Sequence, residues 1–197
     1  VGVTTVQLTA TNVCGTVNCS FTVTVTDNEM PVITCPANIS VCDPGSPVVT
    51  FSVGATDNCG ILSVVSTPAS GSTFAPGTTT VNSIATDVNG NTSSCSFTVT
   101  VSTPSTDPTS VTSDAPFNNI CTGSSTNLTV NGGSLGTGAT WNWYSGSCGG
   151  TAVGTGSTIS VSPTGTTTYF VRAEGACNNT LCASVTITVS AGPVLTN

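Results

Sequence analysis

Two stretches decide the fold: GVTTVQLTATNVCGTVNCSFTVTVT at residues 2–26 and GTTTVNSIATDVNGNTSSCSFTVTVS at residues 77–102. They match with a one-residue gap in the loop and share a TTV segment, an AT[DN] turn and a CSFTVTV segment. Apolar residues alternate with Thr and Ser in both, which is typical of β-strands with one buried face. Because an isolated two-stranded hairpin is marginal in water, we expect residues 1–27 to be the last strands of a truncated module.

Further strand patterns alternate with Gly-, Pro- and Asn-rich turns along the rest of the chain. They predict a complete module over 28–103, a linker over 104–108, a second module over 109–191 and the start of another linker at 192–197. No stretch has helical periodicity. The sequence therefore predicts an all-β chain of tandem antiparallel β-sandwiches. The predicted strands are 47–53, 61–66, 79–86, 96–102, 126–130, 140–144, 157–163, 166–174 and 183–190.

Composition limits the classes of partner. Hydrophobic residues make up 37% of the 197 residues and charged residues 5%, so the chain is too apolar to be disordered. Arg172 is the only basic residue against eight acidic ones, and the net charge is −7. Since a nucleic-acid partner requires cations that neutralise phosphates, nucleic acid and anionic membranes are excluded. No apolar run of about 20 residues is present, which argues against direct membrane insertion.

Ten cysteines occur in a chain that has no His and no CxxC motif. Zinc sites usually combine such ligands at short spacing, so a disulfide framework made in an oxidising compartment is the simpler interpretation. Small β-domains bury too little surface to be robust alone, and each bridge adds about 2–4 kcal/mol. We therefore expect disulfide-stapled sandwiches in a secreted, extracellular protein. The sequence leaves the connectivity open.

The run TDNEMPVITCPANI, followed by ATDNCG, FAPGTTTV, ATDVNGN and CSFTVTV, resembles the hyalin repeat, an immunoglobulin-like extracellular module. The segments ICTGSSTNLTV, WNWYSGSCGGT, TTTYFVRAEGACNN and CASVTITVS, between residues 120 and 190, look like the immunoglobulin-like repeats of very large Bacteroidota surface proteins. The second resemblance implies a cell-surface adhesin, of the kind used in gliding and exported by type IX secretion.

The hyalin resemblance also implies disulfide pairs. Its pattern pairs Cys35 with Cys95, which leaves Cys42 with Cys59. Simpler relatives of the second module imply the pair Cys121–Cys177 and leave Cys148–Cys182, with Cys148–Cys177 as the alternative. Cys14 and Cys19 are expected to bond partners upstream of the hairpin, or else each other.

Four carboxylates fall in segments that a sandwich brings to one pole: Asp27, Glu29, Asp57 and Asp87. With a single Arg in the chain these groups lack cationic partners, and a divalent cation would relieve their repulsion through oxygen ligands. They are the candidate ligands of a calcium site. The alternative is that the Asp and Asn residues only close Asx-type turns in solvent. No other cofactor is expected.

Aromatic residues cluster at TWNWY. Trp141 and Trp143 face one side of the predicted strand and Tyr144 the other. An exposed set would suit a stacked sugar, but a Trp at this place in a sandwich more often packs in the core, and we predict core packing. Phe51, Phe97, Tyr169 and Phe170 are expected to be core or boundary residues. Arg172 is predicted to pair with Glu174 on the same strand face.

No catalytic residues are predicted, because a chain without His or Lys offers Ser and Thr nucleophiles no evident general base. The leading hypothesis is a structural stalk of a large secreted adhesin, in which neighbouring repeats of the same polypeptide are the partners and a distal region binds. One alternative is an immunoglobulin-like module that binds surface glycans or cell-surface proteins. The other is an assembly unit that exchanges strands in a filament.

Overall fold

The computed structural model describes residues 1–192. The chain divides into two compact units. One contains residues 1–39, 48–74 and 78–99, and the other contains residues 40–47, 75–77 and the described chain from 100 onward. The last residues of the linker predicted over 192–197 lie outside the described residues.

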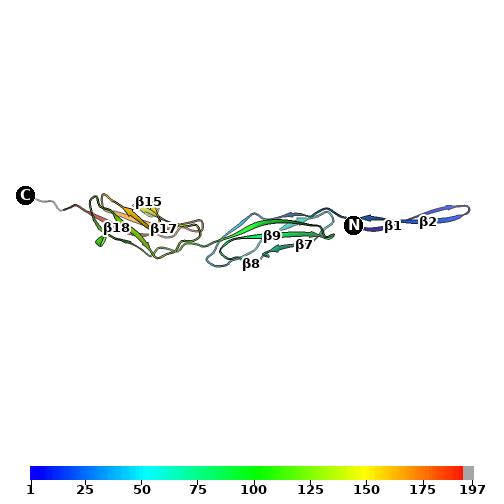
Figure 1. The fold of residues 1–197 in the computed structure, drawn as a ribbon, viewed down its shortest axis with the longest axis horizontal. Coiled ribbons are helices and arrows are strands. Elements are labelled where there is room, and N and C mark those ends of the chain that lie inside the picture. The colour runs from blue at the N-terminus through cyan, green and yellow to red at the C-terminus, as the bar shows by residue number, and fades with distance from the viewer. Residues whose placement is uncertain (193–197) are drawn as a thin grey trace, which may run out of the picture. The chain divides into compact units, whose positions relative to one another are not determined.

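The chain begins with a hairpin of two strands, β1 (Gly2–Asn12) and β2 (Gly15–Val25). They pair antiparallel in an unbroken register from Gly2↔Val25 to Asn12↔Gly15 and form a two-stranded sheet of their own. Both labels lie on this ribbon in Figure 1. The strands predicted from the repeat are therefore present.

The residues that follow form one larger sheet, of strand order β4-β10-β9-β7, and two short strand pairs, β3–β6 and β5–β8. Strands β7 and β9 pair antiparallel and are labelled in Figure 1. The bounds are β3 (Val32–Thr34), β4 (Ile39–Cys42), β5 (Val48–Val49), β6 (Gly54–Thr56), β7 (Ile61–Thr67), β8 (Ser72–Thr73), β9 (Gly77–Asp87) and β10 (Thr92–Ser102).

The long strands β9 and β10 follow the predicted alternation. From Val81 on β9 and from Phe97 on β10, every second residue is buried, among them Ala85 and Val99, because successive side chains of a strand point to opposite faces. The ring of Phe51 packs edge-on against Phe97, with centroids 4.9 Å apart.

The strand predicted over 47–53 is wrong in extent. Only Val48 and Val49 form a strand there. The Ser70 hydroxyl accepts the N–H of Phe51 at 2.8 Å and donates to the Phe51 carbonyl at 2.7 Å. A side chain thus takes both hydrogen bonds that a neighbouring strand would have made, and the ladder ends.

The second unit contains a three-stranded sheet, β11-β13-β16, and a five-stranded sheet, β12-β18-β17-β14-β15. The pair β12–β18 is parallel, an exception to the predicted antiparallel pattern. The bounds are β11 (Ser110–Ser113), the short 3-10 turn η1 (Pro116–Asn118), β12 (Asn119–Cys121), β13 (Thr126–Asn131), β14 (Thr140–Ser145), β15 (Thr151–Thr155), β16 (Thr158–Val161), β17 (Thr167–Glu174) and β18 (Ala183–Ser190).

Both sheets supply one buried cluster. Leu128 and Ile159 come from the smaller sheet, and Trp143, Val171 and Ile187 come from the larger. The cluster fills the space between two layers, as in a β-sandwich. The predicted all-β fold is confirmed.

Candidate functional site

The loop between β9 and β10 is organised by one carboxylate. Asp87 is fully buried at the end of β9. Its Oδ1 accepts the N–H groups of Asn89 and Asn91, both at 2.8 Å, and its Oδ2 accepts the Asn91 amide at 2.7 Å. Burial raises the pKa of Asp87, but these hydrogen bonds outweigh it and hold the pKa below its ordinary value. Asp87 is a structural anion.

Asp27 joins this loop from the segment after β2. Its Oδ1 accepts the N–H of Glu29 at 3.0 Å, and its Oδ2 accepts the Asn89 side-chain amide at 2.8 Å. The Glu29 N–H and then the Asn89 amide lower the pKa of Asp27. The Asn91 amide also donates to the Asp27 carbonyl at 3.3 Å. The Asn side chains of the loop therefore hold the segment around Asp27.

A third segment, the loop between β6 and β7, brings Asp57 and Cys59 to the same place. Asp57 Oδ1 accepts the N–H groups of Cys59 at 2.8 Å and Gly60 at 3.1 Å, while its Oδ2 is buried without a partner in the described chain. One ligand atom each of Asp27, Asp57 and Cys59 lies within 4.8 Å of the others. Desolvation, and then its hydrogen bond to Asp27, raises the pKa of the Cys59 thiol.

Two of the four predicted carboxylates thus come together. Glu29 instead accepts the Asn58 amide at 2.5 Å, and the Asp87 carboxylate is occupied by its own loop. Sequence reasoning missed Cys59, although the TDNCG turn could have indicated it. Calcium prefers oxygen ligands, and a thiol suits softer metals, so the carboxylates form only part of a calcium ligand set. Calcium binding stays a prediction.

The disulfides correct part of the predicted pairing. Bridges join Cys35 to Cys95 and Cys148 to Cys182, as predicted. The third bridge joins Cys42 to Cys177, so the predictions Cys42–Cys59 and Cys121–Cys177 are wrong, and the alternative Cys148–Cys177 is wrong as well.

The position of Ser102 explains the difference. The Asp43 N–H, next to Cys42, donates to the Ser102 carbonyl at 3.0 Å, and the Cys177 sulfur lies 3.4 Å from the same oxygen. Cys59 is instead held in the carboxylate cluster. Among residues 1–192 the cysteines with free thiols are Cys14, Cys19, Cys59 and Cys121.

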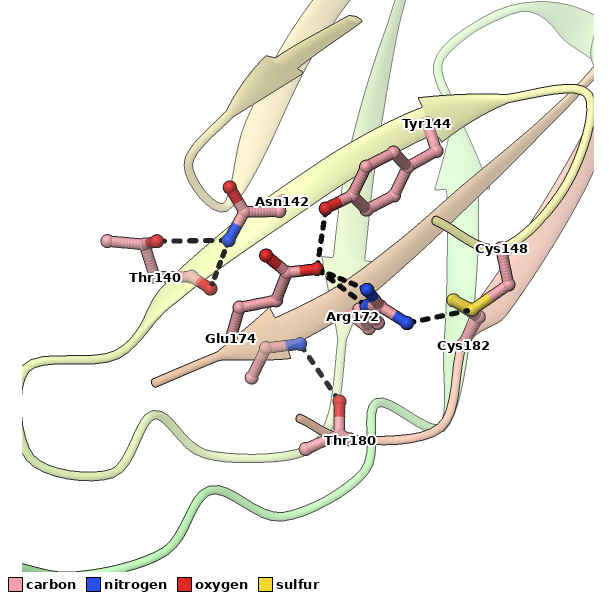
Figure 2. A network of polar contacts seen from close by, with 9 residues as sticks. Thr140, Asn142, Tyr144, Cys148, Arg172, Glu174, Thr180 and Cys182 are labelled. Carbon is pink, nitrogen blue, oxygen red and sulfur yellow. Dashed lines mark hydrogen bonds and ion pairs between the residues drawn. A yellow bond between two sulfur atoms is a disulfide. The ribbon is translucent and has the colours of Figure 1, made fainter. Parts of the chain in front are cut away.

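A second polar cluster lies on β14 and β17, where Figure 2 shows Tyr144 and Arg172 both directed at Glu174. Glu174 Oε1 accepts Arg172 Nε and Nη2, each at 2.6 Å, and the Tyr144 hydroxyl at 2.5 Å. The Arg172 guanidinium also lies 5.4 Å from the centre of the Tyr144 ring. The Tyr144 hydroxyl, helped by Arg172, holds the pKa of Glu174 below its ordinary value. The predicted Arg172–Glu174 pair is confirmed.

The two Trp side chains are core residues, as predicted. Trp143 is fully buried and its indole N–H donates to the Gly156 carbonyl at 2.8 Å, while Trp141 is 7% exposed. A sugar needs an open aromatic face, so the sugar-stacking interpretation of this pair is wrong.

Comparisons with known proteins give two consecutive family matches. Residues 26–101 match the HYR domain, and residues 106–191 match the Ig-like domain described as CHU_C associated. No curated protein matches the chain. Among the residues that the structure describes, no helix is long and apolar enough to span a membrane.

One solved structure supports the fold. Murine CEACAM1b is similar over 81% of this chain and 100% of its own, at 15% identity and a TM-score of 0.51. A mutated three-Ig-domain structure of titin is similar over 83% of this chain and 67% of its own, at 14% identity and a TM-score of 0.49.

These findings point to an extracellular, adhesion-type repeat segment. HYR and Ig-like domains are typically non-catalytic structural modules, and together with the disulfides they fit a secreted or cell-surface protein. Residues 26–101 therefore belong to the HYR family and residues 106–191 to the CHU_C-associated Ig-like family.

Proposed function

We propose that this chain is a load-resistant spacer in the stalk of a large secreted cell-surface adhesin, where it carries a distal binding region away from the cell. The observation that carries the proposal is the overlap of two covalent loops. Cys35–Cys95 and Cys42–Cys177 each close a long stretch of chain, of sequence separation 60 and 135. Since Cys42 lies inside the first loop and Cys95 inside the second, the loops interlock along the sequence.

A stalk under tension must not lengthen when a module unfolds. In the bridged chain the shortest covalent path from Cys35 to Cys177 runs to Cys42 and then across the bridge. At about 3.5 Å per residue, the path from Cys35 to Cys42 reaches about 25 Å, whereas the unbridged chain from Cys35 to Cys177 would reach roughly 500 Å. The bridges therefore limit extension even after the sheets have separated.

Single-molecule pulling on the two ends of the oxidised chain tests this. We expect no unfolding step from the region between Cys35 and Cys177 that lengthens the chain by more than about 25 Å, and steps that total several hundred Å after reduction. The double variant Cys42→Ser, Cys177→Ser is the matched control, because it keeps Cys35–Cys95 and Cys148–Cys182 and leaves a path of roughly 200 Å. Long steps in the oxidised wild-type chain would overturn the proposal.

The partners and the cellular setting of the spacer are part of the same proposal. The spacer acts with neighbouring repeats of one long polypeptide, and the distal region, not this segment, contacts surface glycans or cell-surface proteins. The resemblance to Bacteroidota surface repeats supports export by type IX secretion and a role in gliding. Deletion of this segment in the parent protein is expected to preserve export and to reduce adhesion under flow more than adhesion at rest.

A further inference from the structure

The hairpin β1–β2 and the hairpin β9–β10 have matching sequences and opposite burial. Val99 and Val101 are fully buried and Phe97 is 4% exposed. Their repeat counterparts in β2 are Val23, Val25 and Phe21, which are 43%, 56% and 50% exposed. All six residues are Val or Phe at alternate positions of one strand face, and in the first hairpin Leu8 on β1, 52% exposed, lies on the same face. This apolar face of β1–β2 is uncovered.

The second hairpin shows what covers such a face. Within residues 28–76, Val49 and Phe74 are buried, and Phe51 packs on Phe97. The same segment supplies the neighbouring strand β7 and the cysteine that closes the bridge to Cys95. A segment with the strand and cysteine pattern of residues 28–76 would therefore complement the β1–β2 face.

The positions of the two cysteines in the first hairpin fit a covering segment of this pattern. In the repeat alignment Cys19 corresponds to Cys95, so its partner is the counterpart of Cys35. Cys14 corresponds to Asn89, which is not a cysteine.

The surroundings of Asn89 identify the partner of Cys14. The Asn89 amide donates to Asp27, whose carboxylate lies within 4.8 Å of the Cys59 thiol. The Val88 N–H also donates to the Gly60 carbonyl at 3.1 Å, so the two loops lie side by side. A thiol in place of Asn89 would therefore lie beside the same Asp27 carboxylate as Cys59. In the complete module Asn89 takes that place, and Cys59 stays a free thiol.

We propose that the exposed face of β1–β2 is a docking surface for a HYR-type β-segment with the pattern of residues 28–76. Two disulfides seal the contact, from Cys19 to the counterpart of Cys35 and from Cys14 to the counterpart of Cys59. For each bridge two thiols lose two protons and two electrons to a small disulfide such as oxidised glutathione, which becomes two thiols. This proposal does not depend on the spacer function.

The test is an extended chain in which a copy of residues 28–76 precedes Gly2, refolded with oxidised and reduced glutathione. Peptide mapping without reduction is expected to find both new bridges. Hydrogen exchange is expected to slow in β1–β2 until it matches β9–β10, because the covered strands then share the stability of a packed module. Unchanged exchange in β1–β2, or a bond between Cys14 and Cys19, would overturn the proposal.

Two variants isolate the Cys14 bridge. In the extended chain, Cys14→Asn copies the complete module, and we expect the Cys19 bridge to remain while the added counterpart of Cys59 keeps a free thiol. In the original chain, Asn89→Cys is expected to bond to Cys59, which tests the loop geometry without any added segment. Failure of Asn89→Cys to form that bond contradicts the assignment of Cys14.

The original chain also distinguishes another occupant. Sedimentation under non-reducing conditions is expected to find a monomer whose β1–β2 amides exchange quickly. A dimer that protects those amides would show that a second copy covers the face, and would overturn the proposal.

Discussion

The HYR residues and the Ig-like residues achieve the same sandwich class by different means. The Ig-like unit packs a continuous buried cluster that includes two Trp side chains between its sheets. The HYR residues contain four strands of two or three residues, and they rely on the bridge Cys35–Cys95 and on Asp side chains that close their loops. Apolar packing is more extensive in the Ig-like region, whereas covalent and polar links supplement a smaller buried set in the HYR residues.

The largest expected effect is on the Ig-like core. Trp143→Ala removes a fully buried side chain and the indole hydrogen bond to Gly156, and should cost about 3–5 kcal/mol of unfolding free energy. Both Trp residues lie in this region, so fluorescence of the remaining Trp141 reports its unfolding, while hydrogen exchange follows β9 and β10. Tyr144→Phe, at a partly exposed site on the same strand, is the control and should cost far less. Equal losses of unfolding free energy in the Ig-like and the HYR residues would contradict the comparison between the two regions.

The next effect is on the HYR residues. The double variant Cys35→Ala, Cys95→Ala should lower their unfolding free energy by about 2–4 kcal/mol, since the bridge no longer restricts the unfolded chain. Hydrogen exchange in β9 and β10 measures the loss. The double variant Cys148→Ala, Cys182→Ala is the matched control and should leave β9 and β10 unchanged. Destabilisation of the Ig-like core by the first variant would refute the comparison.

A smaller effect is expected at Asp87. Asp87→Asn keeps an oxygen acceptor for the loop but turns an amide donor toward the Asn91 amide, and should cost about 1–3 kcal/mol. The pKa of Asp87 is lower in the folded chain, so its stabilisation is complete above the ordinary pKa of 3.8 and is lost as the pH falls from there toward the folded value. Acid titration followed by hydrogen exchange should show a shallower loss in the variant than in the wild type.

Calcium is expected to have the smallest effect. Asp27 and Asp57 offer two carboxylates beside a thiol, so any site would resemble the millimolar sites of extracellular modules. Millimolar calcium should raise the unfolding midpoint of the HYR residues slightly, and Asp57→Asn should abolish that rise. Identical midpoints with calcium and with chelator would remove the calcium prediction.

Much of the fold followed from alternation. The strand predicted over 183–190 has the observed bounds, and the one predicted over 96–102 is the second part of β10 (Thr92–Ser102), where every second side chain meets a core. The strand at 47–53 failed because the Ser70 hydroxyl, distant in sequence, takes the hydrogen bonds of Phe51. Local pattern cannot reveal such a partner.

The site was less predictable than the strands. Asp27 and Asp57 were found because TDN turns fall at one pole of a sandwich. The Asp87 carboxylate instead points inward, because the N–H and the side-chain amide of Asn91 donate hydrogen bonds to it. Cys42 was assigned the wrong partner since pairing depends on which backbones approach, here at Ser102, and not on order along the chain.

The single basic residue has a consequence for survival outside a cell. A protease that requires Lys or Arg before the cut has one peptide bond to attack in the whole sequence, between Arg172 and Ala173. That bond lies within β17, which is flanked by β14 on one edge and β18 on the other, and Arg172 is engaged by Glu174. The substrate cleft of such a protease needs an accessible extended segment with an unpaired cation. In the folded chain the backbone of β17 is paired on both edges and Arg172 is ion-paired. Trypsin-like enzymes in the surroundings should therefore leave the folded chain whole.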